Sequence, residues 1–424
     1  MDPTVLDELR RCIRCGTCMG VCPVYEVMRR EAGSARGKLA LVAAREEGVL
    51  GDEGLYRHLL TACLLCGRCT NSCPNQVDVP RVVRAARAGL AERGRLGRLE
   101  RLVLGRLLPG RRGLARLLGL ARLTRWVWAA RVPGESGLHL RFARLPGGAR
   151  RRLPALARPF FLERPQAAQA AGQGPRVALF VGCVNNYLRP EAAQAALEVL
   201  AAAGARVEAP AGQGCCGLPA FSSGAVEGAR ALAARNLEAL WPAGEPGPDL
   251  VTSPCASCAS MLAHHLPGLL AGDPARAERA RALAARVKPF SVVVTGLGGV
   301  RGEGPGRGAS ADLPALTYHD PCHLSRGFGE KDAPRFLLTW LPGLRFVEPS
   351  HPCRCCGQGG TFALHHPELS EALGQDKARR LIETGARYVV TECSGCWLQL
   401  QDLLARAGSE MEVLTTAEAL RRWS

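Results

Sequence analysis

The stretch Cys12-Ile-Arg-Cys15-Gly-Thr-Cys18-Met-Gly-Val-Cys22-Pro23 returns 51 residues later as Cys63-Leu-Leu-Cys66-Gly-Arg-Cys69-Thr-Asn-Ser-Cys73-Pro74. Both copies have the spacing Cys-x2-Cys-x2-Cys-x3-Cys-Pro. Two residues between cysteines let a tight loop present three thiolates to one side, so a fourth must come from elsewhere. Gly16 and Gly67 accept backbone dihedrals that other residues avoid, and Pro23 and Pro74 stop each loop from continuing as helix.

This spacing resembles the ligand run of bacterial two-cluster ferredoxins, in which the fourth cysteine of each run serves the other cluster. The resemblance predicts two 4Fe-4S clusters and a role in electron transfer. The first cluster takes Cys12, Cys15, Cys18 and Cys73, and the second takes Cys63, Cys66, Cys69 and Cys22. Structural zinc is the alternative, but zinc sites use paired Cys-x2-Cys units without the third and fourth cysteines at this interval.

Composition limits the class of protein. The 424 residues, 47% of them hydrophobic, are enough for two or three domains. The N-terminus Met1-Asp2-Pro3-Thr4 shows no apolar export segment, so we expect the protein to stay in the reducing cytoplasm. Because thiols stay reduced there, the 19 cysteines favour metal ligation over disulfides. No apolar run is long enough to span a bilayer. We therefore expect a cytoplasmic protein, either soluble or peripheral on the inner face of the cell membrane.

The residues around the loops have helical patterns. Ser34 is a candidate N-cap for a helix over residues 34–47, residues 75–80 are expected to be extended, and residues 81–92 return to helix. Residues 91–152 contain sixteen arginines and three glutamates, a net +13 of the formal +17. Leucines and tryptophans among the arginines favour a basic amphipathic helix at a membrane surface, and a helical linker with a solvated arginine face is the alternative. No nucleic-acid motif is present, so no nucleic-acid partner is expected.

A second repeat begins at Arg176. Unit one (176–300) contains Cys183, Cys215-Cys216-Gly217 and Cys255-x2-Cys258, and unit two (301–424) contains Cys322, Cys355-Cys356-Gly357 and Cys393-x2-Cys396. The offsets are 139 residues for the first cysteine, 140 for the pair and 138 for Cys-x2-Cys, which indicates two copies of one domain.

In each unit the cysteines follow apolar runs of strand character, and helical stretches at 190–203, 223–240, 366–384 and 397–407 alternate with these runs. The alternation predicts a small α/β domain with a mainly parallel sheet. Ligands of such sheets gather beyond the carboxyl ends of the strands, so five thiols should converge in each unit. The fold class expected is therefore α/β plus α. It consists of a ferredoxin-like domain (1–90), an Arg-rich helical linker (91–175) and the two units.

These repeats resemble the cysteine-rich CCG domain. Together with the paired ferredoxin motif, the chain resembles the iron-sulfur subunit of glycolate oxidase, lactate-utilisation iron-sulfur proteins, the iron-sulfur subunit of anaerobic glycerol-3-phosphate dehydrogenase and the D-type subunit of heterodisulfide reductase. In heterodisulfide reductases the CCG domain holds a non-cubane 4Fe-4S cluster, so the resemblance implies one or two further iron-sulfur clusters. The match extends to Cys183, Cys215, Cys216, Cys255 and Cys258, and to Cys322, Cys355, Cys356, Cys393 and Cys396. Zinc or purely redox-active thiols remain the alternative, since spacing alone does not identify the metal.

Cys353 and the three residues that flank Cys322 fall outside both patterns. Cys353 is expected to be a buried or free thiol. His319, Asp320 and His323 could tune a cluster or relay protons, and a capping or packing role is the simpler interpretation of each.

The sequence also lacks a recognisable flavin or nicotinamide site, because Gly296-Leu-Gly-Gly and Gly357-Gln-Gly-Gly lack the Gly-x-Gly-x-x-Gly spacing. The resemblance therefore implies a separate FAD-containing dehydrogenase, with glycolate or D-lactate as its substrate, and a quinone or other membrane acceptor. One alternative is a reductase that cleaves a disulfide at CCG clusters. Another is a binding module in which the Arg-rich segment holds nucleic acid or anionic lipid.

Overall fold

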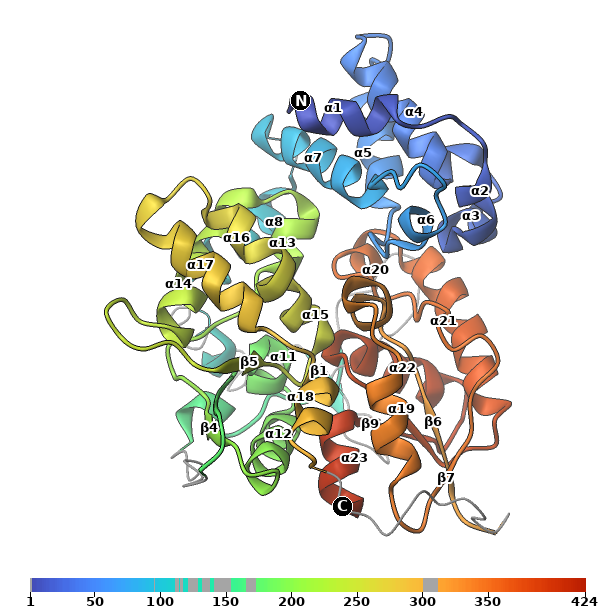
Figure 1. The fold of residues 1–424 in the computed structure, drawn as a ribbon. Helices are drawn as coiled ribbons and strands as arrows, with labels where there is room; N and C mark the ends of the chain where they lie inside the picture. Colours follow the sequence, from blue (N-terminus) through green and yellow to red (C-terminus); the bar gives the residue numbers. More distant parts are fainter. Residues whose placement is uncertain are drawn as a thin grey trace.

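The computed structural model describes residues 2–94, 96–110, 114, 117–120, 129–131, 138–140, 154–164, 173–299 and 312–424. A helical N-terminal domain lies across one end of two α/β units (Figure 1). The helix predicted within residues 91–152 falls largely outside the described residues. Those described in this segment include α8 (Arg98–Leu102), a π-helical turn (Val103–Leu107), helical residues at 114 and 117–120, and an antiparallel pair of β1 (Ala129–Arg131) and β2 (Leu138–Leu140). None of the described helices is both long and apolar enough to cross a bilayer.

The N-terminal domain consists of short helices around an apolar core. They are α1 (Pro3–Arg10), α2 (Thr17–Val21), α3 (Pro23–Met28), α4 (Ala35–Glu46), α5 (Glu53–Thr61), α6 (Arg68–Asn71) and α7 (Val79–Glu92). The predicted helix over 34–47 is confirmed as α4, and the Ser34 hydroxyl accepts the Gly37 N–H at 3.1 Å as its cap.

The extended exit predicted for residues 75–80 is wrong at its end, because α7 begins at Val79. The Asp78 carboxylate caps this helix by accepting the Arg81 N–H at 3.0 Å. Pro80 is tolerated in the first turn, where its missing N–H needs no partner.

Unit one has a parallel sheet in the order β4-β3-β5, made of β3 (Arg176–Leu179), β4 (Arg206–Glu208) and β5 (Leu250–Thr252). Its helices are α11 (Gly182–Tyr187), α12 (Pro190–Ala202), α13 (Leu218–Ser223), α14 (Val226–Leu240), α15 (Ala256–Ser260), α16 (Leu266–Leu270), α17 (Pro274–Arg286) and α18 (Phe290–Gly296), with a π-helical turn at Met261–His265. The parallel α/β architecture expected for the unit is thus confirmed.

Unit two repeats this plan with the order β7-β6-β8-β9. The strands are β6 (Ala315–Tyr318), β7 (Arg345–Phe346), β8 (Tyr388–Thr391) and β9 (Glu412–Thr415), all parallel. The helices are α19 (Asp332–Thr339), α20 (Phe362–His365), α21 (Pro367–Ile382), α22 (Ser394–Arg406) and α23 (Thr416–Trp423), and a π-helical turn spans His323–Phe328. Where unit two has β9, unit one has a single parallel bridge between Val251 and Val287.

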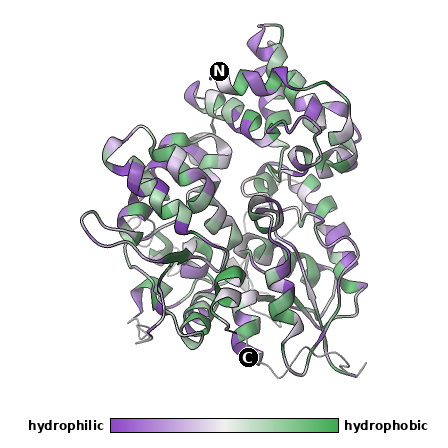
Figure 2. Cartoon of the chain, viewed as in Figure 1, coloured by the Kyte–Doolittle hydropathy of each residue, from purple (hydrophilic) through white to green (hydrophobic). Residues whose placement is uncertain are grey.

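The two units share their hydrophobic cores. Along β3, Val177 and Leu179 point into one core and Ala178 into the other, as the two-residue period of a strand requires. Each core also receives strand residues of unit two, such as Leu316 on one side and Val389 on the other. Figure 2 shows hydrophobic residues along the strands and hydrophilic residues on many outer helical turns. The units therefore pack as one body, with α12 against α23.

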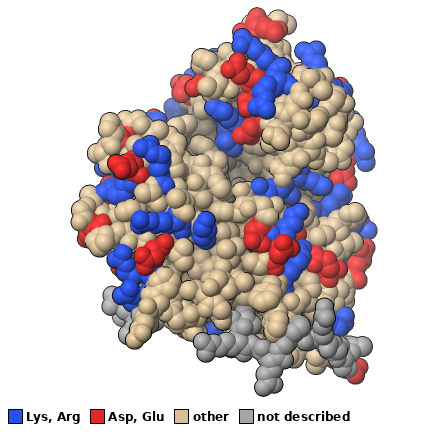
Figure 3. Space-filling view, in the orientation of Figure 1, with Lys and Arg blue, Asp and Glu red and all other residues tan. Residues whose placement is uncertain are grey.

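The sequence concentrates positive charge in residues 91–152, but positive and negative side chains are mixed on one face of the described domains. On the face drawn in Figure 3, Lys and Arg are interspersed with Asp and Glu. Ion pairs also join the domains. Arg354 of unit two, for example, contacts Glu26 of α3 at 2.5 Å, and within its own unit it contacts Asp376 of α21 at 2.6 Å.

Arg87 on α7 joins the N-terminal domain to unit one. Its guanidinium is 6% exposed and donates to the carbonyl oxygens of Leu60 and Cys63, each at 2.7 Å. On the other side it donates to the carbonyl oxygen of Ser222 in α13, also at 2.7 Å. A single buried cation thus holds one cysteine loop against unit one.

We expect Arg87→Ala to lower the free energy of unfolding by about 3 kcal/mol, because buried carbonyls lose a charged donor. Chemical denaturation under anaerobic conditions measures this value. Arg81→Ala, at an exposed position of the same helix, serves as the control and should cost about 1 kcal/mol or less. Equal effects of the two variants would contradict the role given to Arg87.

Candidate metal centres

Two cavities lie beside the cysteine loops of the N-terminal domain. One is lined by Cys12, Cys15, Cys18 and Cys73, together with Cys69. The other is lined by Cys22, Cys63, Cys66 and Cys69. The structure thus brings the cysteines together in the crossed sets that the spacing predicts, and four thiols around a largely apolar cavity suit a 4Fe-4S cluster.

The local backbone explains how each loop presents its thiols. Gly16 and Gly67 are in the left-handed conformation, with φ of +86° and +74°, and α2 and α6 begin directly after them. Only glycine adopts this conformation without strain. The positive φ therefore turns the chain sharply between the second and third cysteines of each run.

The two cavities differ in their access to solvent. Cys15 of the first set is exposed, and the neighbouring Ile13 is 65% exposed. In the second set, burial raises the pKa of Cys66 to about 11, and burial also raises the pKa of Cys69. The first cavity therefore has one exposed thiol, whereas the four cysteines that line the second are all half-buried.

Three buried or largely buried cations surround the second cavity, and the sequence analysis missed all of them. Lys38 lines the cavity, is 1% exposed and donates to the Gly33 carbonyl oxygen. Arg87 donates to the Cys63 carbonyl oxygen, and Arg326 of unit two donates to that of Cys66 at 2.7 Å. Lys38 had a visible signal, since it is one of four lysines in the chain and lies one helical turn before the buried Val42.

The cysteines of the two CCG units form one continuous array. Hydrogen bonds between thiols connect Cys183 to Cys215, Cys215 to Cys216, Cys216 to Cys258 and Cys258 to Cys255 in unit one. The same kind of contact connects Cys393 to Cys396, Cys396 to Cys356 and Cys356 to Cys355 in unit two. Cys255 and Cys393 are also hydrogen-bonded, so the two sets predicted separately meet at the boundary between the units.

The meeting point is built from strand ends and helix starts. Cys255 follows β5 and caps α15, and Cys393 follows β8 and caps α22. The Ala256 N–H donates to the Glu392 carbonyl oxygen at 2.7 Å, which fixes the two strand tips to each other. Of the two, only Cys255 has a lowered pKa, chiefly through its contact with Cys258, whereas the contact with Cys255 raises the pKa of Cys393.

The array cannot ionise as a whole without a cation. Hydrogen bonds from Cys258 and Cys393 hold the pKa of Cys255 below the usual value of a thiol, and those from Cys355 and Cys396 do the same for Cys356. The pKa of Cys258 and that of Cys396 are correspondingly raised by the same contacts and by burial. A metal centre supplies the positive charge that lets all ligands be thiolates together.

The second cavity and unit two are neighbours. The thiol of Cys66 interacts electrostatically with those of Cys322 and Cys355. Burial raises the pKa of Cys322, but the nearby His323 outweighs burial and lowers the net value to about 7. His323 Nδ1 also lies 2.9 Å from the Ser257 hydroxyl of unit one, a contact that the sequence did not signal.

The remaining residues near Cys322 have simpler roles. Asp320 accepts two hydrogen bonds from Arg335, each at 2.9 Å, and it also accepts one from the half-buried thiol of Cys353 at 3.3 Å. Asp320 is therefore held in a structural ion pair. His319 differs from both, because its ring lies beside Cys356 and Cys396.

Comparison with known proteins agrees with this geometry. The model of the CCG cysteine-rich domain matches residues 177–263 and 316–401, and the model of a 4Fe-4S dicluster domain matches residues 8–77. The chain belongs to the CCG family of iron-sulfur proteins. Its N-terminal and CCG parts bind iron-sulfur clusters, and its role is in electron transfer. The family models do not define the domain limits predicted above, which remain predictions.

Two relatives show the range of this family. Lactate utilization protein A 2 of Bacillus mycoides is 34% identical over 246 residues, which are 58% of this chain and 98% of that protein. One of the subunits of the fumarate reductase (CoM/CoB) of Methanothermobacter marburgensis is 29% identical over 430 residues, 97% of this chain and 72% of that protein.

We expect Lys38→Met to lower the reduction potential of the second N-terminal cluster, because the buried ammonium stabilises the electron added on reduction. A redox titration followed by electron paramagnetic resonance measures both N-terminal clusters in one sample. Lys288→Met, at an exposed position of unit one, should leave both potentials unchanged. Equal shifts of both clusters in Lys38→Met would contradict a local effect.

Proposed function

We propose that this chain is the iron-sulfur subunit of an FAD-linked 2-hydroxy-acid dehydrogenase, with glycolate or D-lactate as the substrate of its flavoprotein partner. The chain takes electrons from the flavin and passes them through the two N-terminal clusters to the CCG units. From there they reach a quinone or another acceptor. The eighteen cysteines in the two loops and the two units serve as the cluster ligands. Bound clusters supply one-electron redox chemistry.

One observation carries this proposal, namely the unbroken series of thiols from the surface to the boundary between the units. Cys15 is exposed at the first cavity, and Cys69 lines both cavities. Cys66 of the second cavity is close to Cys322 and Cys355, where the thiols of unit two begin. Each proposed metal centre therefore lies next to the following one along the path, as the transfer of single electrons between centres requires.

The direction of flow follows from the environment of the centres. The first cavity has the exposed thiol of Cys15, and its cations are the exposed Arg14 and the half-buried Arg36. The second has the buried Lys38 in its lining, with Arg87 and Arg326 at its loop carbonyls. Positive charge stabilises the reduced form of a cluster. The proposed path thus enters at the exposed first cluster and continues inward to a more easily reduced second one. The name of the lactate-utilisation relative supports a 2-hydroxy acid as the source of electrons.

The test uses the whole chain, purified without oxygen and mixed with the candidate flavoprotein and either glycolate or D-lactate. We expect the iron-sulfur absorbance to bleach with one of the two acids, and to remain unchanged when the flavoprotein is omitted. Full bleaching by dithionite shows that the clusters are competent. Clusters that respond to dithionite but to neither acid would overturn the proposal.

A second candidate function is the reduction of a disulfide at the CCG site, favoured by two observations. The Methanothermobacter relative aligns over 97% of this chain, and both units hold a complete set of five cysteines. The reaction consumes two electrons and two protons to convert one disulfide into two thiols. The electrons would arrive one at a time from the N-terminal clusters.

This candidate predicts turnover of a small disulfide with reduced methyl viologen as donor and without flavoprotein. Cys322→Ser should abolish the turnover, because this thiol belongs to the array of unit two. Cys353→Ser is the matched control and should retain it, since Cys353 lies outside both cysteine patterns and contacts Asp320. Thiol release and viologen oxidation measure the rate, and absence of turnover in the wild type would exclude this function.

A further inference from the structure

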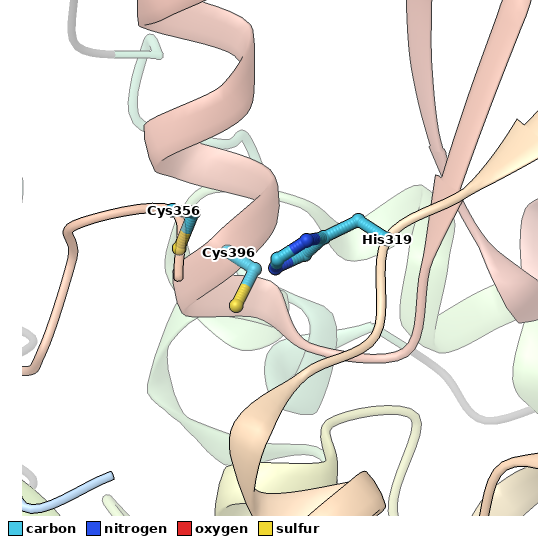
Figure 4. A group of neighbouring side chains, drawn as sticks. All are labelled: His319, Cys356 and Cys396. Atoms are coloured by element: carbon cyan, nitrogen blue, oxygen red, sulfur yellow. The ribbon is translucent and has the colours of Figure 1, made fainter. Parts of the chain in front are cut away.

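His319 brings an imidazole into the cysteine site of unit two. It directly follows β6 and is 1% exposed. A ring nitrogen of His319 and the Sγ atoms of Cys356 and Cys396 all lie within 4.8 Å of one another. Figure 4 shows the ring reaching from the loop after β6 toward Cys396 on α22, with Cys356 beyond Cys396 on the same side of the ring. In the described part of the chain, this is the one group of three such side chains close enough to hold a metal ion.

Unit one lacks this feature. At the interval of 139 residues that relates the first cysteines, the residue corresponding to His319 is Phe180. Phe180 is fully buried and has no atom that can ligate a metal. The counterparts of Cys356 and Cys396 are Cys216 and Cys258, whose thiols are hydrogen-bonded to each other. The two units therefore share a backbone plan but offer different ligand atoms.

The imidazole of His319 is hydrogen-bonded to the thiol of Cys356, a contact that packing alone does not require. Its Nδ1 atom has no hydrogen-bond partner among the described residues, and the backbone N–H of His319 is already used by the Val390 carbonyl oxygen at 2.9 Å. An unpaired buried polar atom costs about 1–3 kcal/mol. The phenyl ring of unit one fills the equivalent position without that cost. The ring nitrogen beside the two thiols is therefore already directed at Cys356, and a metal bound there would use its lone pair.

We propose that His319 is a ligand of a metal centre in unit two, which therefore has a mixed imidazole and thiolate ligand set, whereas unit one uses cysteine alone. This rests on the proposal above that the cysteines of unit two hold a metal centre. Ligands bound 2.0–2.3 Å from zinc in a tetrahedral site are roughly 3.5–3.8 Å apart, so the group needs only a small contraction. One further thiol completes a four-ligand set, either Cys393, which is hydrogen-bonded to Cys396, or Cys355, which is hydrogen-bonded to Cys356.

A neutral imidazole changes the charge of the centre. Replacing one thiolate by histidine removes a negative charge, and iron-sulfur centres with imidazole ligands have higher reduction potentials than all-cysteine centres. If the metal is iron, unit two is then more easily reduced than unit one. If the metal is zinc, the centre is redox-inert. The nitrogen ligand is the same in both cases.

The experiment uses the full chain, purified without oxygen with either natural-abundance or 15N-labelled histidine. Iron, zinc and sulfide are quantified. Pulsed electron paramagnetic resonance then detects nitrogen bound to paramagnetic iron, and X-ray absorption at the zinc edge detects nitrogen bound to zinc. We expect a histidine nitrogen on one of the two metals. Iron detection would agree with electron delivery to unit two, whereas zinc would support the ligand assignment but count against that step of the proposed function.

Two variants assign the nitrogen. His319→Phe, which copies unit one, should lose the nitrogen signal and the metal of unit two while the N-terminal cluster signals persist. His264→Phe, at an exposed position of the π-helical turn in unit one, should change neither. His319→Cys should keep the metal without the nitrogen signal, so the assignment stays testable even if the phenylalanine variant does not fold. A metal environment of sulfur alone in the wild type, or a nitrogen signal that persists in His319→Phe, would overturn the assignment.

Discussion

Burial of many thiols in a small volume is the constraint on which the rest of this structure depends. Two parallel sheets direct their carboxyl ends to one boundary, and the cysteines that follow the strands form a single array there. Thiolates in such a place repel one another and lose hydration. The contacts between thiols relieve this only in part, because each lowered pKa is balanced by a raised one. Metal cations resolve the conflict, which makes iron-sulfur binding part of the stability of the fold.

The N-terminal domain meets the same constraint with side-chain cations as well. Arg87 and Arg326 each bridge a cysteine loop and a CCG unit through backbone carbonyls. Lys38 adds a third positive charge from within the domain. The groups that offset the charge of a cluster are thus in part the groups that join the domains. Electrostatics at the second cavity and the relative position of the units are therefore linked.

Duplication explains the architecture, and divergence of the two copies explains its asymmetry. The strands, the Cys-Cys-Gly turn and the final Cys-x2-Cys recur at nearly constant intervals. Unit two completes a fourth strand where unit one has one bridge, and it has His319 where unit one has Phe180. A relay gains from such differences, because identical centres would give electrons no preferred direction.

The sequence by itself determined the repeat and the parallel α/β class and predicted the cysteine sets, because loop spacing, strand ends and internal offsets are local properties of the chain. It also indicated α4 and its Ser34 cap. The predicted start of α7 was two residues late. Asp78 caps the helix and Pro80 is accepted in its first turn, and both favour a helical over an extended conformation at Val79. Only the tertiary structure decided that both thiol sets form one array, that Cys66 lies beside unit two, and that Lys38, Arg87 and His319 face the cysteines. Those contacts join residues far apart in the chain, and no local pattern encodes which buried faces meet.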